Sequence, residues 1–118
     1  MPAENRTLTL VARLMLIDAV TFAIASILHL GVAESFIGAA IPEAIIAVVL
    51  GAAAIAVMQR GAGSWGLALT ATLFALAGVI IGLSVIIGGP VSRPIDLAYH
   101  ATILVALVGT VVLLLRSR

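Results

Sequence analysis

The stretch that decides the fold runs from Leu8 to Leu30, LTLVARLMLIDAVTFAIASILHL. It is almost wholly apolar and, as a helix, long enough to cross the roughly 30 Å hydrocarbon core of a bilayer. It nevertheless contains Asp18 near its middle and His29 near its end. An ionisable group at membrane depth costs about 2.5–3.5 kcal/mol on insertion scales, so such residues mark a pathway, a ligand or a buried partner.

Composition places the rest of the chain in lipid as well. Hydrophobic residues make up 64% of the 118 residues and charged residues only 9%, whereas soluble domains carry roughly 25% charged residues. The net charge of +1 predicts no nucleic-acid partner. Because the chain has no cysteine, disulfides, thiolate metal sites and cysteine nucleophiles are excluded.

The apolar segments predict an all-α bundle of four transmembrane helices, at 8–30, 42–58, 65–87 and 95–115. The second segment is short, although residues 36–41 can extend it. The connections are too short to form a soluble domain, so residues 1–118 are expected to form one membrane domain. Thr7 or Thr9 is expected to cap the first helix, and Pro42 to lie in the first turn of the second.

The arginines predict the orientation of this bundle. All six basic residues are arginines, and only Arg93 lies on the face opposite the other five. The positive-inside rule therefore places both termini and the loop at 59–64 of this multi-pass chain in the cytoplasm. Five polar residues then gather at the outer face: His29, Glu34, Glu43, Asp96 and His100.

Asp18 and His29 are candidates for a proton relay. Eleven residues apart, they lie within about 20° of one another around a helix and roughly 16 Å apart along it, with Phe22 and Ala25 on the same face. One hypothesis is a polar track that leads inward to Asp18. The alternative is an Asp18 hydrogen-bonded to Thr21 or to a neighbouring helix, with His29 at the membrane interface.

A metal site is the second hypothesis. Asp96, Tyr99 and His100 occupy positions i, i+3 and i+4 of the last helix, a spacing that brings a carboxylate and an imidazole to one face. With His29 and Glu43, a bundle could assemble two imidazoles and two carboxylates, which suit Zn, Mn, Fe or Cu. The alternative is that Asp96 and Glu43 lie in first helical turns, where the helix dipole favours acids.

The two histidines also admit a cofactor. His29 and His100 could ligate a b-type haem between the first and fourth spans, with Ala25, Ala98 and Ala101 leaving room for the porphyrin. The competing interpretation is a pair of interfacial histidines.

Small residues follow one face of the third span. Ala71, Ala75, Gly78 and Gly82 form this strip, and the last two make a GxxxG pair. Such a strip is typical of a close helix contact, within one chain or between subunits.

Three short stretches together resemble a known group of proteins. They are LHLGV at 28–32, IPEAIIAVVLG at 41–51 and GPVSRPIDLAYH at 89–100. These stretches are similar to those of small four-span membrane proteins of high-GC bacteria, whose biochemistry is unassigned. The resemblance implies the fold and the location, a multi-pass protein of the bacterial cytoplasmic (inner) membrane, and supplies no catalytic residues. Small multidrug transporters share the length and an acid in the first span, but this chain has few aromatic residues for a cation pocket and a strong arginine bias.

No catalytic motif is present, so the sequence disfavours an enzyme. The leading hypothesis is a protein that binds or senses a small ligand, a divalent metal ion, at the outer end of the bundle. A homo-oligomer is expected because one small bundle offers little interior for so many polar groups. The alternatives are a scaffold subunit of a larger membrane complex with no ligand, a bis-histidine haem protein, and a proton-coupled small transporter that uses Asp18.

Overall fold

The computed structural model describes residues 3–31, 37–89 and 94–118, with side chains from Arg6 onward. These ranges form four α-helices and one short turn of 3-10 helix, η1 (Gly61–Ser64), which joins the second helix to the third. The α-helices are α1 (Ala3–His29), α2 (Ile37–Arg60), α3 (Trp65–Gly88) and α4 (Pro94–Arg116). All the elements that the described residues form are therefore helices, as the apolar segments of the sequence predict.

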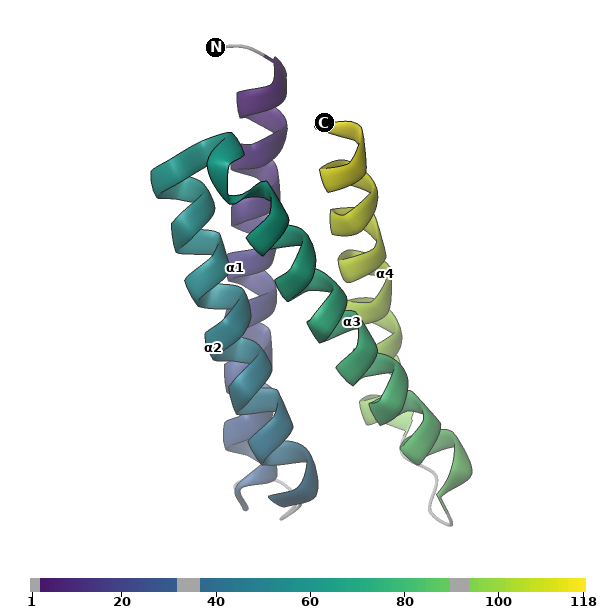
Figure 1. Ribbon diagram of the computed structural model, residues 1–118. Coiled ribbons are helices and arrows are strands. Elements are labelled where there is room, and N and C mark those ends of the chain that lie inside the picture. The colour runs from purple at the N-terminus through teal and green to yellow at the C-terminus, as the bar shows by residue number, and fades with distance from the viewer. Residues whose placement is uncertain (1–2, 32–36, 90–93) are drawn as a thin grey trace.

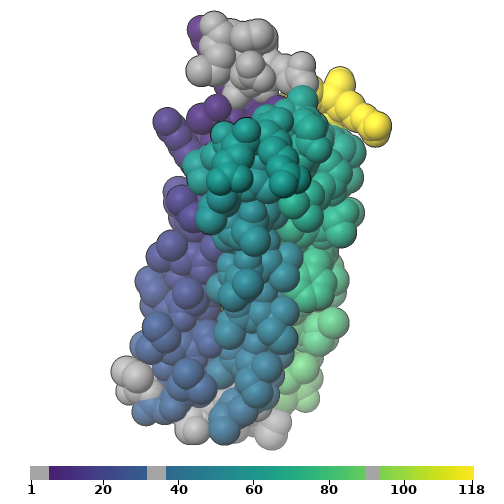
Figure 2. Space-filling model, turned by 60° about the vertical axis from the view of Figure 1, so that its left-hand side comes forward, coloured from purple at the N-terminus to yellow at the C-terminus, as the bar shows by residue number. Residues whose placement is uncertain are grey.

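The helices run up and down along a molecule that measures 49 × 21 × 17 Å. Both termini and η1 lie at one end, and the end of α1, the start of α2, the end of α3 and the start of α4 lie at the other (Figure 1). Helix α1 packs most extensively against α2, and α3 against α4. These two pairs diverge toward the end opposite the termini (Figure 1). On one face of the molecule α2 lies between α1 and α3 (Figure 2).

Three continuous helical stretches of the described chain are long and apolar enough to cross a membrane: Arg6–His29, Ile37–Gly88 and Pro94–Arg116. The middle stretch contains α2, η1 and α3. Large apolar side chains such as Val48, Ile87 and Val105 are more than 70% exposed on the outside of the bundle. A surface of this kind suits lipid rather than water, because it forms apolar patches that soluble monomers avoid.

The small-residue strip of α3 faces the inside of the bundle. Ala71 and Ala75 are buried. A Cβ on Gly78 would come within 2.6 Å of the Cδ1 atom of Ile46 on α2, so this glycine lets the Ile46 side chain approach the α3 backbone. The predicted helix contact is thus formed within the chain.

Helix α2 begins five residues before the position expected from the sequence. Pro42 lies inside the helix rather than in its first turn, where it forfeits one backbone hydrogen bond, to the carbonyl of Gly38. The Ser26 hydroxyl donates a 2.7 Å hydrogen bond to the Ala40 carbonyl, and this bond fastens the added turn of α2 to α1. The expectation that Pro42 lies in the first turn of this helix was wrong, because a tertiary bond of this kind cannot be recognised from a local sequence pattern.

The first helix also begins earlier than expected. Helix α1 starts at Ala3, so Thr7 and Thr9 lie within it and neither occupies the capping position.

A glycine makes the turn after α2. Gly61 adopts a φ of +54°, which a glycine tolerates at little cost. This conformation starts the η1 turn that sends the chain back as α3.

Contacts of Trp65 close the end of the bundle that holds the termini. Its indole Nε1 donates a 2.7 Å hydrogen bond to the carbonyl of Leu114. The guanidinium of Arg118 lies 4.6 Å from the centre of the same ring, in cation–π geometry. The start of α3 is therefore fixed to the end of α4.

Candidate ligand-binding cavity

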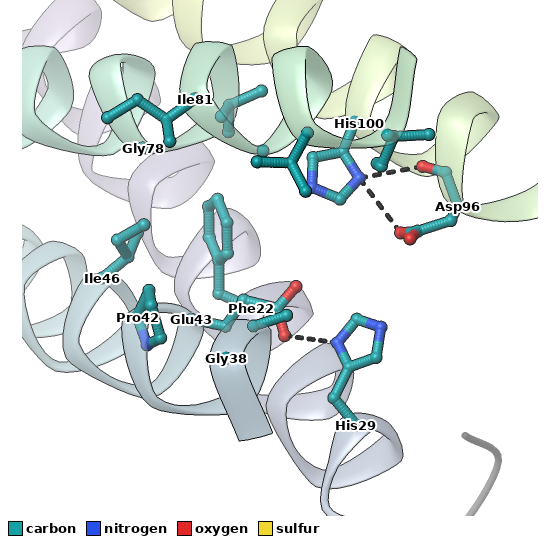
Figure 3. Close-up of a pocket in the computed structure, with 15 residues that line it drawn as sticks. Phe22, His29, Gly38, Pro42, Glu43, Ile46, Gly78, Ile81, Asp96 and His100 are labelled. Atoms are coloured by element: carbon teal, nitrogen blue, oxygen red, sulfur yellow. Dashed lines mark hydrogen bonds and ion pairs between the residues drawn. The ribbon is translucent and has the colours of Figure 1, made fainter. Parts of the chain in front are cut away.

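A cavity of about 140 Å³ lies between the two helix pairs, near the end of α1, the start of α2, the end of α3 and the start of α4. All four helices contribute to its lining. Its wall is mainly apolar, and its polar residues are the four that the sequence singled out as ligands (Figure 3): His29, Glu43, Asp96 and His100. Residues far apart in the chain thus meet in one place.

The first polar pair joins α1 to α2. His29 Nδ1 donates a 2.7 Å hydrogen bond to Glu43 Oε2, and the exposed fractions of the two side chains are 14% and 7%. His29 is the last residue of α1. Glu43 is the seventh residue of α2, and the first turn of that helix holds no acid. The helix dipole therefore does not explain Glu43, and the observed partner of its carboxylate is the imidazole.

The second polar pair lies within α4. His100 Nδ1 donates to the Asp96 backbone carbonyl at 2.8 Å and lies 3.1 Å from Asp96 Oδ1. The predicted i, i+4 relationship therefore places the two side chains in contact. Asp96 lies in the first turn of α4, so the dipole contributes to its position as expected.

Gly82 determines where the His100 ring lies. A Cβ at position 82 would come within 2.8 Å of His100 Nε2 and 3.1 Å of its Cδ2. The imidazole thus packs directly on the α3 backbone, which only a glycine permits. Sequence reasoning placed Gly82 in a helix contact but missed this role. The sequence signal for this role was that Gly82 belongs to the small-residue strip and that a polar residue, His100, lies on the facing helix.

The four polar residues form two pairs rather than one metal centre. Within the described part of the chain, no group of three or more His, Cys, Asp or Glu side chains is arranged to hold a metal ion. In each pair the imidazole Nδ1 already contacts a carboxylate oxygen, at 2.7 Å in His29–Glu43 and at 3.1 Å in His100–Asp96, and the two pairs lie on opposite walls of the cavity (Figure 3). The expected arrangement of His29, Glu43, Asp96 and His100 around one ion is therefore not present in this conformation.

The haem hypothesis does not fit this cavity. The volume of the cavity is about 140 Å³. Pockets for drug-sized ligands measure roughly 300–1,000 Å³, and a porphyrin is at least as large as such a ligand. Ala98 and Ala101, which were expected to make room for the macrocycle, are exposed on the outside of α4. In addition, His100 Nε2 faces Gly82 rather than an open space.

Asp18 lies deeper in the bundle and faces protein, as expected for a carboxylate at membrane depth. Only 4% of the residue is exposed, and Phe22 and Ala25 on the same stripe are also buried. Thr21 is not its partner, because the Thr21 hydroxyl donates to the Ile17 carbonyl at 2.8 Å. Among the described residues, Asp18 Oδ2 has no hydrogen-bond partner.

Tyr99, like Asp18, has a buried side-chain oxygen, its hydroxyl, without a hydrogen bond to any of the described residues. Its ring packs edge-on against Phe22 with centroids 6.4 Å apart and against His100 at 5.1 Å. Sequence reasoning noted its i+3 spacing from Asp96 and gave it no role.

Two residues expected at the outer membrane face, Glu34 and Arg93, lie outside the described residues.

Comparison of the chain with protein-family models, with curated proteins and with solved structures gives no match.

Proposed function

We propose that this chain is a four-span protein of the bacterial cytoplasmic membrane, with cytoplasmic termini, that binds a small ligand in the cavity at the outer end of its bundle. The orientation is supported by the arginines, because five of six lie toward the end that holds the termini and η1. The observation that carries the function is the convergence of two acid–imidazole pairs, from opposite helix pairs, on one cavity.

The ligand that suits these groups best is a divalent metal ion. A carboxylate hydrogen-bonded to the Nδ1 atom of an imidazole is the arrangement that orients metal-binding histidines, and the His29–Glu43 pair has it. In our proposal His29, Glu43 and Asp96 supply ligand atoms, while His100 positions Asp96. This mixture of nitrogen and oxygen ligands is typical of Zn, Mn or Fe sites.

Metal binding in this way requires the two helix pairs to approach one another. The pairs diverge at the cavity (Figure 1), and an ion held by residues of both pairs favours a closed bundle over an open one. A ligand shifts a conformational equilibrium by its difference in affinity for the two states. The proposed protein is therefore a sensor whose signal is closure of the outer end.

The apolar wall of the cavity favours a second candidate ligand. Its apolar lining includes Phe22, Ile46, Val79, Val85 and Ile86, and mainly apolar pockets with a few polar groups are typical of small organic ligands. Such a ligand would place a cationic or hydrogen-bonding group between Glu43 and Asp96.

Metal analysis of the purified protein tests the proposal. We expect about one Zn²⁺ or Mn²⁺ per chain in equilibrium dialysis, as for a site with a single set of ligands. Glu43→Gln and Asp96→Asn should each lose most of this binding. Thr102→Val should retain it, because Thr102 is an exposed residue of the same helix as Asp96 and its hydroxyl donates to the Ala98 carbonyl of that helix.

Binding of a small amine without metal uptake would favour the organic ligand. If neither binds, the scaffold hypothesis replaces the sensor, and the cavity groups serve only to hold the helices together.

The structure also changes the argument for a homo-oligomer. Polar residues of the described chain are buried within a single bundle, among them Asp18, Ser26, Glu43, Thr72, His100 and Thr110. A homo-oligomer or a larger membrane complex therefore remains a proposal that needs separate support. Cross-linking of single-cysteine variants in native membranes tests it, since the natural chain has no cysteine.

A further inference from the structure

Asp18 and Tyr99 carry the two buried side-chain oxygens that lack a hydrogen-bond partner among the described residues. They come from facing helices, α1 and α4, and Phe22, one helical turn after Asp18, packs edge-on against the Tyr99 ring. Leaving a buried polar group unpaired costs about 1–3 kcal/mol. Two such groups in one region indicate a site that takes up something beyond the chain itself.

The titratable groups other than Asp18 that lie inside the bundle are on the outer side of Asp18, whereas Arg13 on its other side is exposed. Helix α2 contributes Glu43, α4 contributes Tyr99, Asp96 and His100, and α1 itself contributes His29 at the cavity. The sequence of α3 contains no titratable residue. The Tyr99 ring packs edge-on against His100 in the wall of the cavity, with centroids 5.1 Å apart, and against Phe22, one helical turn from Asp18, at 6.4 Å. The Tyr99 side chain therefore lies between the region of Asp18 and the polar wall of the cavity.

Toward the end that holds the termini, the interior is apolar. Val11, Met15, Val57 and Leu114 are buried there. The buried hydroxyls of Thr72 and Thr110 donate to carbonyls of their own helices, Ala68 and Ala106. Among the described residues, no titratable side chain is buried between Asp18 and that end of the bundle.

We infer that Asp18 is a proton-binding site that exchanges with the outer face alone, through Tyr99 and the cavity. A hydronium ion in the cavity gives a proton to the Tyr99 oxygen as the hydroxyl proton of Tyr99 passes, through one bridging water, to Asp18 Oδ2. Tyr99 is neutral before and after this step, and Asp18 changes from carboxylate to carboxylic acid. The site is thus an outward-facing proton store rather than one station of a path across the membrane.

This inference rests on the proposed membrane orientation but not on the identity of the cavity ligand. Labelling of introduced cysteines determines the orientation separately, so a failure of the orientation and a failure of the proton site give different results.

Carbodiimide labelling of the natural chain tests the inference. Dicyclohexylcarbodiimide enters membranes and reacts with protonated carboxyl groups, and peptide mass spectrometry locates the adduct. Right-side-out and inverted vesicles are labelled while the bath pH is varied and the pH inside is clamped by trapped buffer. In right-side-out vesicles we expect the amount of Asp18 adduct to increase as the bath pH is lowered. In inverted vesicles we expect the amount of adduct to be independent of the bath pH.

The connection through Tyr99 is tested with a matched pair of variants. Tyr99→Phe retains the ring contact with Phe22 and removes the hydroxyl, so labelling of Asp18 should follow a jump in bath pH more slowly and reach the same final extent. Thr21→Val removes a hydroxyl that donates to the Ile17 carbonyl of its own helix and should leave the rate unchanged.

Three results would overturn the inference: no adduct on Asp18 at any pH, an adduct that follows the pH at the cytoplasmic face, or an adduct that follows both faces. An unchanged rate in Tyr99→Phe would remove Tyr99 from the route.

Discussion

His100 Nε2 lies directly over the backbone of Gly82, at a place where a Cβ atom would approach it to 2.8 Å. This contact joins α3 to α4 beside the cavity. It also fixes the position of the His100 ring, whose Nδ1 atom lies 3.1 Å from Asp96 Oδ1. The position of one acid at the cavity thus depends on a missing side chain on another helix.

Gly82→Ala should therefore destabilise the bundle. The added methyl group must displace the His100 ring, and overpacking of this kind costs typically about 1–3 kcal/mol. Thermal unfolding in detergent measures the loss. Gly109→Ala is the control, because a Cβ there meets no atom within 4 Å and alanine is favoured over glycine inside a helix by roughly 0.5–1 kcal/mol. Equal effects of the two substitutions would show that the ring does not pack on α3.

Metal binding should weaken in acid. A protonated imidazole has no lone pair to donate, so uptake of Zn²⁺ releases protons and falls as the pH is lowered. Equilibrium dialysis across a pH series measures this, and His29→Ala should remove most of the binding at every pH. Uptake that is the same at acidic and neutral pH would contradict a site that uses His29.

Cysteines placed in the connections should report the orientation. Those at Glu34 and Val91 should react with impermeant reagents from outside intact cells, and one at Gly61 should not, because the arginine bias places the η1 turn in the cytoplasm. Equal labelling of all three would indicate dual orientation and would return the small multidrug transporters as the relevant comparison.

Asp18→Asn should leave the thermal stability almost unchanged. The structure shows no hydrogen bond to Oδ2 that the substitution could break. Ser26→Ala offers a contrast, since it loses the 2.7 Å bond to the Ala40 carbonyl, a loss of about 1 kcal/mol. A larger loss in Asp18→Asn than in Ser26→Ala would show that the carboxylate holds the bundle together.

Local patterns in the sequence were enough to predict helical, bilayer-length segments and the residues that meet at the cavity. Helical periodicity placed Asp18, Phe22 and Ala25 on one stripe, and all three are buried. The spacing of Asp96 and His100 predicted their contact, which the structure confirms. Such predictions succeed because apolar length and the helical repeat act over short distances along the chain.

What only the tertiary structure decided is how the helices face one another. The bond from Ser26 to Ala40 extends α2 beyond its sequence signals, and the imidazole of His29 selects Glu43 as its partner across two helices. The divergence of the helix pairs separates that carboxylate from Asp96, so four residues that could share one ion form two pairs instead. Sequence spacing carries no information about such distances, because they depend on the packing of side chains such as Ile46 on Gly78 and His100 on Gly82.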